Sequence, residues 1–295
     1  MQFISRYFGM LLLISCLIGL VVPSAGSGTS LIVIVSLAFI IFCSFFQINF
    51  SPSALATDIT ISFKFWLARY LIIPVIAYFA FKWISEFYAL ILLLSFVLPA
   101  AVSSPAFATI FGGKPELSLK ILLYSSFLAV ITIPILMRTL GGSAIQVSAG
   151  QLLLTLVYTI LVPFVLHLPL RHNHAIKEFV GHYNALFTLL ALCTIFVVVT
   201  ARNKPAILAN PEKVGLYALI ALVIYTIMYV LGYYLFPNTH QDVRRTFSIS
   251  SGANNIGLGV TITALFFPGE MNIFFIVSQL IWVLMLIPLR KAFKH

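Results

Sequence analysis

The sequence predicts an all-α polytopic membrane protein that crosses the bilayer ten times. Of its 295 residues, 61% are hydrophobic and only 8% are charged, whereas a soluble domain carries about 25% charged residues. The chain therefore has too few polar side chains to cover a water-facing surface. It also has no long polar segment that could build a separate soluble domain, so we expect a single transmembrane domain, 1–295.

Apolar stretches of about 20 residues, the length needed to cross a bilayer, alternate with short stretches rich in Gly, Pro, Asn and Asp. The first stretch also has signal-peptide features, but its apolar run is longer than a signal needs, and we expect it to remain as a membrane helix. The ten predicted helices are 5–22, 29–48, 62–81, 86–111, 116–138, 146–168, 182–200, 214–236, 244–267 and 271–289.

The basic residues indicate how the chain is oriented. The formal net charge of +10 comes from bases in short connections, which points to membrane topology and anionic lipid and not to a nucleic-acid partner. With ten crossings, eleven Lys and Arg residues fall on the side that holds both termini and five on the other, with Arg69 unassigned. We therefore expect a multi-pass protein of the cell inner (plasma) membrane with both termini in the cytoplasm.

The fourth predicted helix carries a start signal in its interior. Ser104 followed by Pro105 is typical of a helix N-terminus, with Ser as the cap and Pro at the first helical position. This pair lies deep in an apolar run, so we expect a helix that stops and restarts inside the membrane. Such irregular backbone at membrane depth is tolerated where it lines a cavity or is buried in protein.

The ninth predicted helix contains a similar polar interruption, from which we expect a restart near Asn254. Ser104 and Ser250 are 146 residues apart, about half the chain. Five helices in each half would insert in opposite orientations, as in transporters built from inverted repeats, here 1–139 and 140–295. The interrupting residues are Ser250, Ser251, Gly252, Asn254 and Asn255.

Two stretches resemble a known family. Residues Arg244 to Gly259, RRTFSISSGANNIGLG, resemble the ninth-helix signature of the bile acid:sodium symporter family, and Pro99 to Ser118 aligns without a gap with its fourth and fifth helices. The resemblance implies a panel domain and a core domain, with the fourth and ninth helices unwound and crossing in the core. It also implies transport of an organic anion, such as a bile acid or a small carboxylate, together with sodium.

The resemblance extends only partly to the family's ligand residues. It implies that Ser104 and Ser118 ligate sodium and that Gly252 and Asn255 belong to the ninth-helix core. Neutral oxygens can hold a hard cation, so a possible sodium site would consist of Ser104, Ser118, Ser250 and Asn254, with Na+ as the possible cofactor. The departures are Ser250 for a glutamate, Pro105 for an asparagine, Leu122 for a threonine, Asn254 for a glutamine and Leu67 for a glutamine, and they leave sodium coupling open.

The substrate is expected at the two restarts. Helix N-termini carry free N–H groups and a positive dipole end, and no Asp or Glu lies near either interruption. This combination favours an anionic partner, a small organic anion such as a carboxylate. The predicted substrate-binding residues are Ser103, Ser104, Pro105, Ala106, Gly252, Asn254 and Asn255.

Several alternatives remain open from the sequence. Arg69 lies about two turns inside the third helix, and with Lys64 at the interface nearby we expect its side chain to snorkel to the membrane surface. An enzyme is not expected, because no hydrolase or metalloprotease motif is present. A sodium-independent permease of the auxin-efflux type, a non-transporting sensor, proton coupling, and a monomeric or homodimeric state all stay open.

Overall fold

The computed structural model describes residues 2–23, 26, 29–46, 58–141, 149–209, 211–267 and 269–293. Each predicted segment coincides with one helix, with one helix that contains a π-helical turn, or with one interrupted helix pair. The end of the second predicted helix, 47–48, and the beginning of the sixth, 146–148, lie outside the described residues. Two helices contain a π-helical turn, which leaves them continuous. The elements are α1 (Gln2–Val21), α2 (Ser30–Phe45), α4 (Ile59–Trp66), the π-helical η2 (Leu67–Ile72), α5 (Ile73–Lys82), α6 (Glu86–Val97), α7 (Ser104–Ile110), α8 (Pro115–Leu140), α9 (Ala149–Leu156), the π-helical η4 (Val157–Leu161), α10 (Val162–Leu170), α11 (His174–Ala209), α12 (Pro211–Tyr234), α13 (Gln241–Gly252), α14 (Ile256–Phe266) and α15 (Gly269–Ala292).

Five described helices are long and apolar enough to cross a membrane. They are Ile59–Lys82, Pro115–Leu140, Gly150–Leu170, His174–Pro205 and Pro211–Tyr234. The shorter apolar helices are Met10–Val21, Ser30–Phe45, Glu86–Val97 and Ile256–Phe266.

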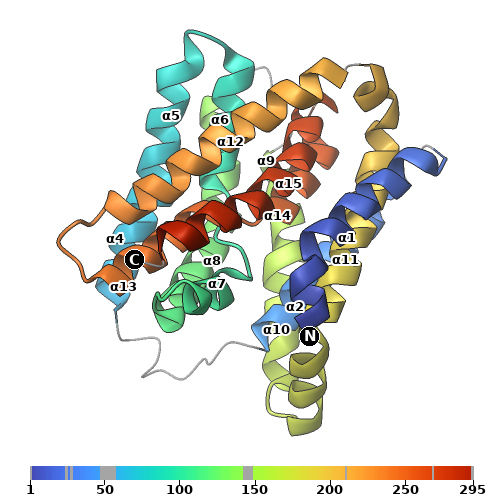
Figure 1. The fold of residues 1–295 in the computed structure, drawn as a ribbon. Coiled ribbons are helices and arrows are strands. Elements are labelled where there is room, and N and C mark those ends of the chain that lie inside the picture. The colour runs from blue at the N-terminus through green and yellow to red at the C-terminus, as the bar shows by residue number, and fades with distance from the viewer. Residues whose placement is uncertain are drawn as a thin grey trace.

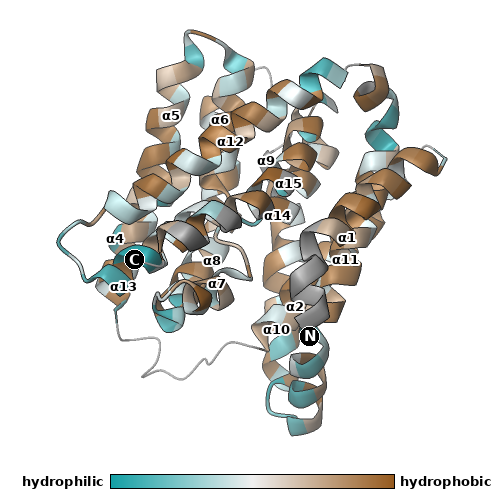
Figure 2. Cartoon of the chain, in the orientation of Figure 1, coloured by the Kyte–Doolittle hydropathy of each residue, from teal (hydrophilic) through white to brown (hydrophobic). Residues whose placement is uncertain are grey.

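The outer surface is apolar, as a lipid-facing surface must be. Val21, Leu31, Ile76 and Leu219 expose between 59% and 82% of their surface. Figure 2 shows hydrophobic ribbon along most of the helices and hydrophilic ribbon mainly at the connections between them. Together with the spanning helices, this surface identifies a membrane protein.

The helices form two groups (Figure 1). The first helix group consists of α1, α2, α9–α10 and α11, in which α11 packs against α1 and α2, and α2 packs against α10. The second helix group consists of α4 to α8 and α12 to α15. The two groups meet where α14 packs against α2 and α11, where α15 packs against α1 and α11, and where α8 packs against α9 and η4.

Close helix packing in the second group depends on two glycines. A Cβ added at Gly232 of α12 would lie 2.5 Å from Ser251 Cβ of α13, and a Cβ at Gly252 would collide with the ring of Tyr229. Small residues of this kind let membrane helices approach closely. Phe65 of α4 and Phe247 of α13 stack with ring centroids 4.4 Å apart, which joins α13 to the third span.

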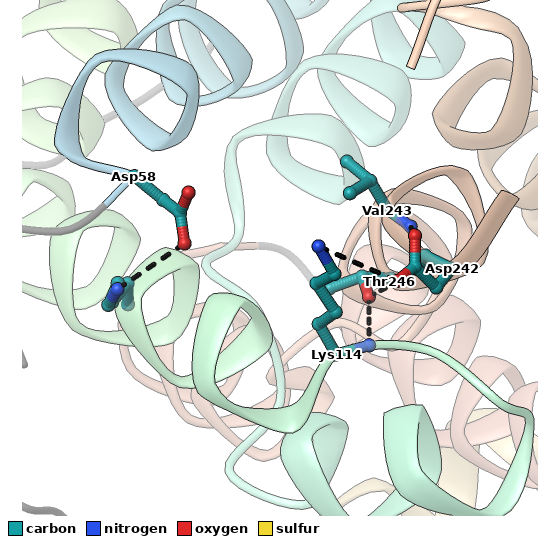
Figure 3. Close-up of polar contacts among 6 residues, drawn as sticks. Asp58, Lys114, Asp242, Val243 and Thr246 are labelled. Carbon is teal, nitrogen blue, oxygen red and sulfur yellow. Dashed lines mark hydrogen bonds and ion pairs between the residues drawn. The ribbon is translucent and has the colours of Figure 1, made fainter. Parts of the chain in front are cut away.

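Polar contacts tie the beginning of α13 to the connection between α7 and α8 (Figure 3). The backbone N–H of Lys114 donates to Thr246 Oγ at 2.6 Å, and the Thr246 hydroxyl donates to the carbonyl of Asp242 at 2.8 Å. The side chains of Lys114 and Asp242 form a half-exposed ion pair at 3.5 Å. Gly113 fits here because an added Cβ would lie 2.7 Å from the same Thr246 oxygen.

Candidate binding site at the helix crossing

The fourth predicted helix is interrupted, as expected. α6 ends at Val97, the backbone is non-helical through Leu98 to Ser103, and α7 begins at Ser104. The cap position is therefore Ser103 and not Ser104, and the Ser103 side chain makes no capping hydrogen bond. Ser104 instead donates its backbone N–H to the carbonyl of Ala101 at 2.9 Å, and the new helix starts one residue earlier than expected.

The ninth predicted helix is interrupted at the matching place. α13 ends at Gly252 and α14 begins at Ile256. Asn255 is the N-cap of α14, because its side-chain oxygen accepts the backbone N–H of Leu258 at 3.1 Å. The cap of the new helix therefore lies one residue after the expected Asn254. Asn255 fixes the start of α14, because its side chain accepts a backbone N–H that has no partner within the helix.

The two interruptions pair with each other. Ala100 and Asn254 form an antiparallel β-bridge, in which the N–H of Ala101 donates to Ala253 and the N–H of Asn255 donates to Pro99, at 2.6 and 2.8 Å. The N–H of Ala100 donates to Ser125 Oγ of α8 at 3.1 Å. These bonds satisfy backbone groups that lipid cannot, so the two helix pairs cross through their unwound segments.

Arg69 lies at this crossing and does not snorkel. Its side chain is fully buried. Nη1 donates to the carbonyl of Phe96 at 2.6 Å, Nη2 to the carbonyl of Ser251 at 2.7 Å, and Nε to Ser251 Oγ at 2.6 Å. The prediction failed because it considered only the distance along the helix to the interface, whereas carbonyls left unpaired where α6 and α13 end provide partners inside the protein.

Asn254 faces Arg69 and α6. Its side-chain oxygen lies 3.5 Å from Arg69 Nη2, and its amide nitrogen donates to the carbonyl of Ser95 at 2.7 Å. The amide also lies 3.4 Å from Met228 Sδ. Asn254 is thus a buried connector between the two interrupted helices, only 2% exposed.

Three of the four residues predicted to hold a metal come together. Ser118 Oγ lies 3.2 Å from both Ser104 Oγ and Ser250 Oγ, and all three side chains are fully buried. Asn254, the fourth, points to Arg69 and Ser95 instead. The serine cluster joins α7, α8 and α13 at the crossing.

The residues at the crossing fit a sodium ion poorly. The serine cluster offers three neutral hydroxyls that already contact one another, without a carboxylate. The carbonyls of Phe96 and Ser251, oxygens of the type that hard cations prefer, are occupied by the Arg69 guanidinium. Among the described residues no group of three or more His, Cys, Asp or Glu side chains could hold a metal.

The remaining predicted substrate residues differ in accessibility. Ser103, Pro105 and Asn255 are partly exposed and Ala106 is exposed, whereas Gly252 and Asn254 are buried. Asn255 lies where the helix groups meet, since a Cβ added at neighbouring Gly257 would lie 3.6 Å from its Oδ1 and within 3.7 Å of Leu37 and Leu192 side chains. The accessible residues therefore lie at the starts of α7 and α14, next to the buried crossing in the chain.

Discontinuous helices that cross and pair through their unwound segments are a feature of secondary-transporter folds. A family model described as the sodium bile acid symporter family matches residues 58–210, a little over half of the chain. The chain belongs to this family. The matched range includes Arg69, Ser104 and Ser118 and ends before α13.

The chain is also similar, at low identity, to a protein whose name states no function. The chain is 22% identical over 197 residues to the uncharacterized protein YbaS of Bacillus subtilis. This match covers 64% of the chain and 63% of that protein's length. The substrate and coupling ion therefore have to be argued from the site.

Proposed function

We propose that the protein is a secondary transporter of a small organic anion, a carboxylate or a bile-acid-like molecule. The observation that carries this proposal is the excess of positive charge at the crossing. Among the described residues, the hydrogen bonds of the Arg69 guanidinium go to neutral oxygens, and the seven acidic residues lie in or near the first turn of a helix and not in the interrupted segments. A buried positive charge of this kind favours an anionic ligand nearby.

The proposed anion contacts are the accessible residues Ser103, Pro105, Ala106 and Asn255. Several amides expected to bind the anion are already used, because Ser104 and Phe107 donate to Ala101 and Ser103, respectively. The attraction would therefore come from Arg69 and the helix dipoles more than from direct N–H contacts.

We further propose ten membrane crossings arranged as two inverted repeats, with the first helix group as the panel and the second as the core. Equivalent contacts in the two halves support this symmetry. The contact between α1 and α11 corresponds to the contact between α10 and α2. In the same way, the α5–α6 contact corresponds to the α12–α13 contact, and the α7–α8 contact corresponds to the α14–α15 contact. An even number of crossings is consistent with both termini being cytoplasmic in the plasma membrane, and cysteine-labelling of the two ends in intact cells tests it. The oligomeric state, monomer or homodimer, follows from the mass of the detergent-solubilised protein.

The test of transport starts from purified protein in proteoliposomes. Thermal-shift screening against small carboxylates and taurocholate selects a stabilising anion, whose radiolabelled form is then used for uptake. We expect accumulation by the wild type and strong loss in Asn255→Asp, which retains the capping oxygen but adds a negative charge at the anion site. Asn255→Ser, which retains a cap without charge, is the matched control.

An anion that stabilises the protein but never accumulates would favour the sensor. Uptake that is equal in wild type and Asn255→Asp would remove Asn255 from the site. Membership of the family does not favour an auxin-efflux-type permease.

A further inference from the structure

We propose that Arg69 is a built-in cation at the helix crossing and that the protein transports without a sodium ion there. The inference rests on the proposed function and concerns how the same site is energised. It reverses the expectation of sodium that membership of the family brings.

The guanidinium occupies a cage of oxygens at which a metal cation would otherwise be favoured. The donors of Arg69 reach the carbonyl of Phe96, the carbonyl and hydroxyl of Ser251, and the side-chain oxygen of Asn254, at 2.6 to 3.5 Å. Two of these oxygens are main-chain carbonyls where α6 and α13 end, the negative ends of the helix dipoles. Neutral oxygens drawn from two crossing helices are the ligands of a hard cation, and here a side chain already binds them.

The charge of Arg69 is not used in an ion pair. Within the described part of the chain, the ion pairs are Lys114–Asp242, Lys120–Asp58, His174–Glu178 and Lys213–Glu270, and Arg69 belongs to none. A fully buried charge is costly. Among the described residues it is compensated by the neutral oxygens at the two helix ends and by the aromatic faces of Tyr70 and Phe96, about 5 Å away. A charge that stabilises two helix ends performs the electrostatic task of a bound cation.

A covalently attached cation has a different consequence from a bound one. A sodium ion enters from one side and leaves to the other, and its gradient can drive the substrate. Arg69 cannot dissociate, so it holds the crossing together in every state of the cycle and transfers no energy from a sodium gradient. The serine cluster, in which the Ser118 hydroxyl bonds those of Ser104 and Ser250, offers no second complete cage.

The test compares melting temperatures in about 0.2 M sodium chloride and in potassium chloride of equal concentration, without any organic anion. We expect the wild type to melt at the same temperature in both salts. Arg69→Gln, which leaves the carbonyls of Phe96 and Ser251 without a cation, should be destabilised in potassium and raised by about 4 °C in sodium. Arg69→Lys, which keeps a positive charge, should show no sodium response. A purely structural role for Arg69 would destabilise the variant without making it sodium-responsive.

Several outcomes would overturn the proposal. Sodium-specific stabilisation of the wild type would overturn it. This holds whether or not the stabilisation disappears in Ser118→Ala, a variant in which the serine cluster is disrupted. A folded Arg69→Gln that ignores sodium would do so as well. If Arg69→Gln does not fold in either salt, the wild type and Arg69→Lys decide: no sodium response in either supports the built-in cation, and a response in either refutes it.

Uptake gives the second readout and separates the two proposals. Wild-type proteoliposomes should take up the screened anion equally with a sodium or a potassium gradient, a ratio near one. Sodium should raise uptake by Arg69→Gln at least several-fold. If no anion accumulates under any condition the transport function fails, while the melting comparison still judges Arg69.

Discussion

The backbone N–H of Ala101 donates to the carbonyl oxygen of Ala253 at 2.6 Å, across 152 residues of sequence. This bond and its partner from Asn255 to Pro99 join two helix interruptions into one antiparallel bridge. The bridge is accompanied by close contacts between the same helices, and the predictions below test these contacts and the polar contacts at the helix starts.

Gly252→Ala should destabilise the protein, because its Cβ would collide with the Tyr229 ring of α12. Overpacking of this kind costs about 1–3 kcal/mol, measured as a lower melting temperature in detergent. Gly215→Ala is the matched control on α12, since nothing lies within 4 Å of its added Cβ, and it should be neutral or slightly stabilising. Equal melting temperatures for the two variants would contradict the close approach of α12 and α13.

Ser118→Ala should lower stability by about 1–2 kcal/mol, because one hydroxyl bridges Ser104 and Ser250 and its loss leaves both with fewer partners. Thr226→Ala, which removes a hydroxyl that bonds its own helix at exposed Leu222, should change stability far less. Thermal unfolding of both variants checks this. A larger effect from Thr226 than from Ser118 would argue against the serine cluster.

Asp58→Asn should cost more than Asp242→Asn, although each carboxylate pairs with a lysine. The Lys120 side chain is 5% exposed, whereas that of Lys114 is 47% exposed. The Lys120 ammonium is buried but the Asp58 carboxylate is half-exposed, so neutralising Asp58 should cost roughly 1–2 kcal/mol of stability. Neutralising Asp242 in the more exposed pair should cost about 0.5 kcal/mol. Asn at 58 also tolerates the left-handed φ of +58° there. The two variants are compared by thermal unfolding at low salt. Equal losses of stability would contradict the prediction.

Thr246→Val should destabilise more than Lys114→Gln. The Thr246 oxygen accepts the backbone N–H of Lys114 and fits against Gly113, so its loss removes the side-chain partner of a part-buried amide (Figure 3). The cost is about 1 kcal/mol, whereas the Lys114 side chain contributes only a half-exposed ion pair. Limited proteolysis of the α7–α8 connection should show faster cleavage in Thr246→Val alone.

Much of the crossing could be predicted from sequence. Ser104–Pro105 and the Ser250 to Asn255 stretch are poor continuations of a helix, so local backbone chemistry located both interruptions to within one or two residues. Capping side chains act over three or four residues. This is why the restart predicted near Asn254 is close to the observed one, in which Asn255 is the cap and Ile256 is the first helical residue.

The role of Arg69 could not be predicted from local chemistry. Its partners Phe96 and Ser251 lie 27 and 182 residues away, and only the tertiary crossing brings their carbonyls to the guanidinium. The signal available was a charge well inside an apolar span, and the nearby Lys64 made a surface position equally reasonable. The same limit applies to Asn254, whose type predicted a ligand but whose neighbours Ser95 and Met228 were not apparent from spacing.

The bonds at the crossing also determine where the molecule can yield. Pulling the two unwound segments apart would strand a guanidinium, two carbonyls and two amides in a lipid-like interior. The contact of α14 with α2 and α11 is of another kind, because the atoms that face Gly257 there include side-chain carbons of Leu37 and Leu192. For the proposed transport cycle we therefore expect the crossing to stay intact while α2 and α11 shift past α14.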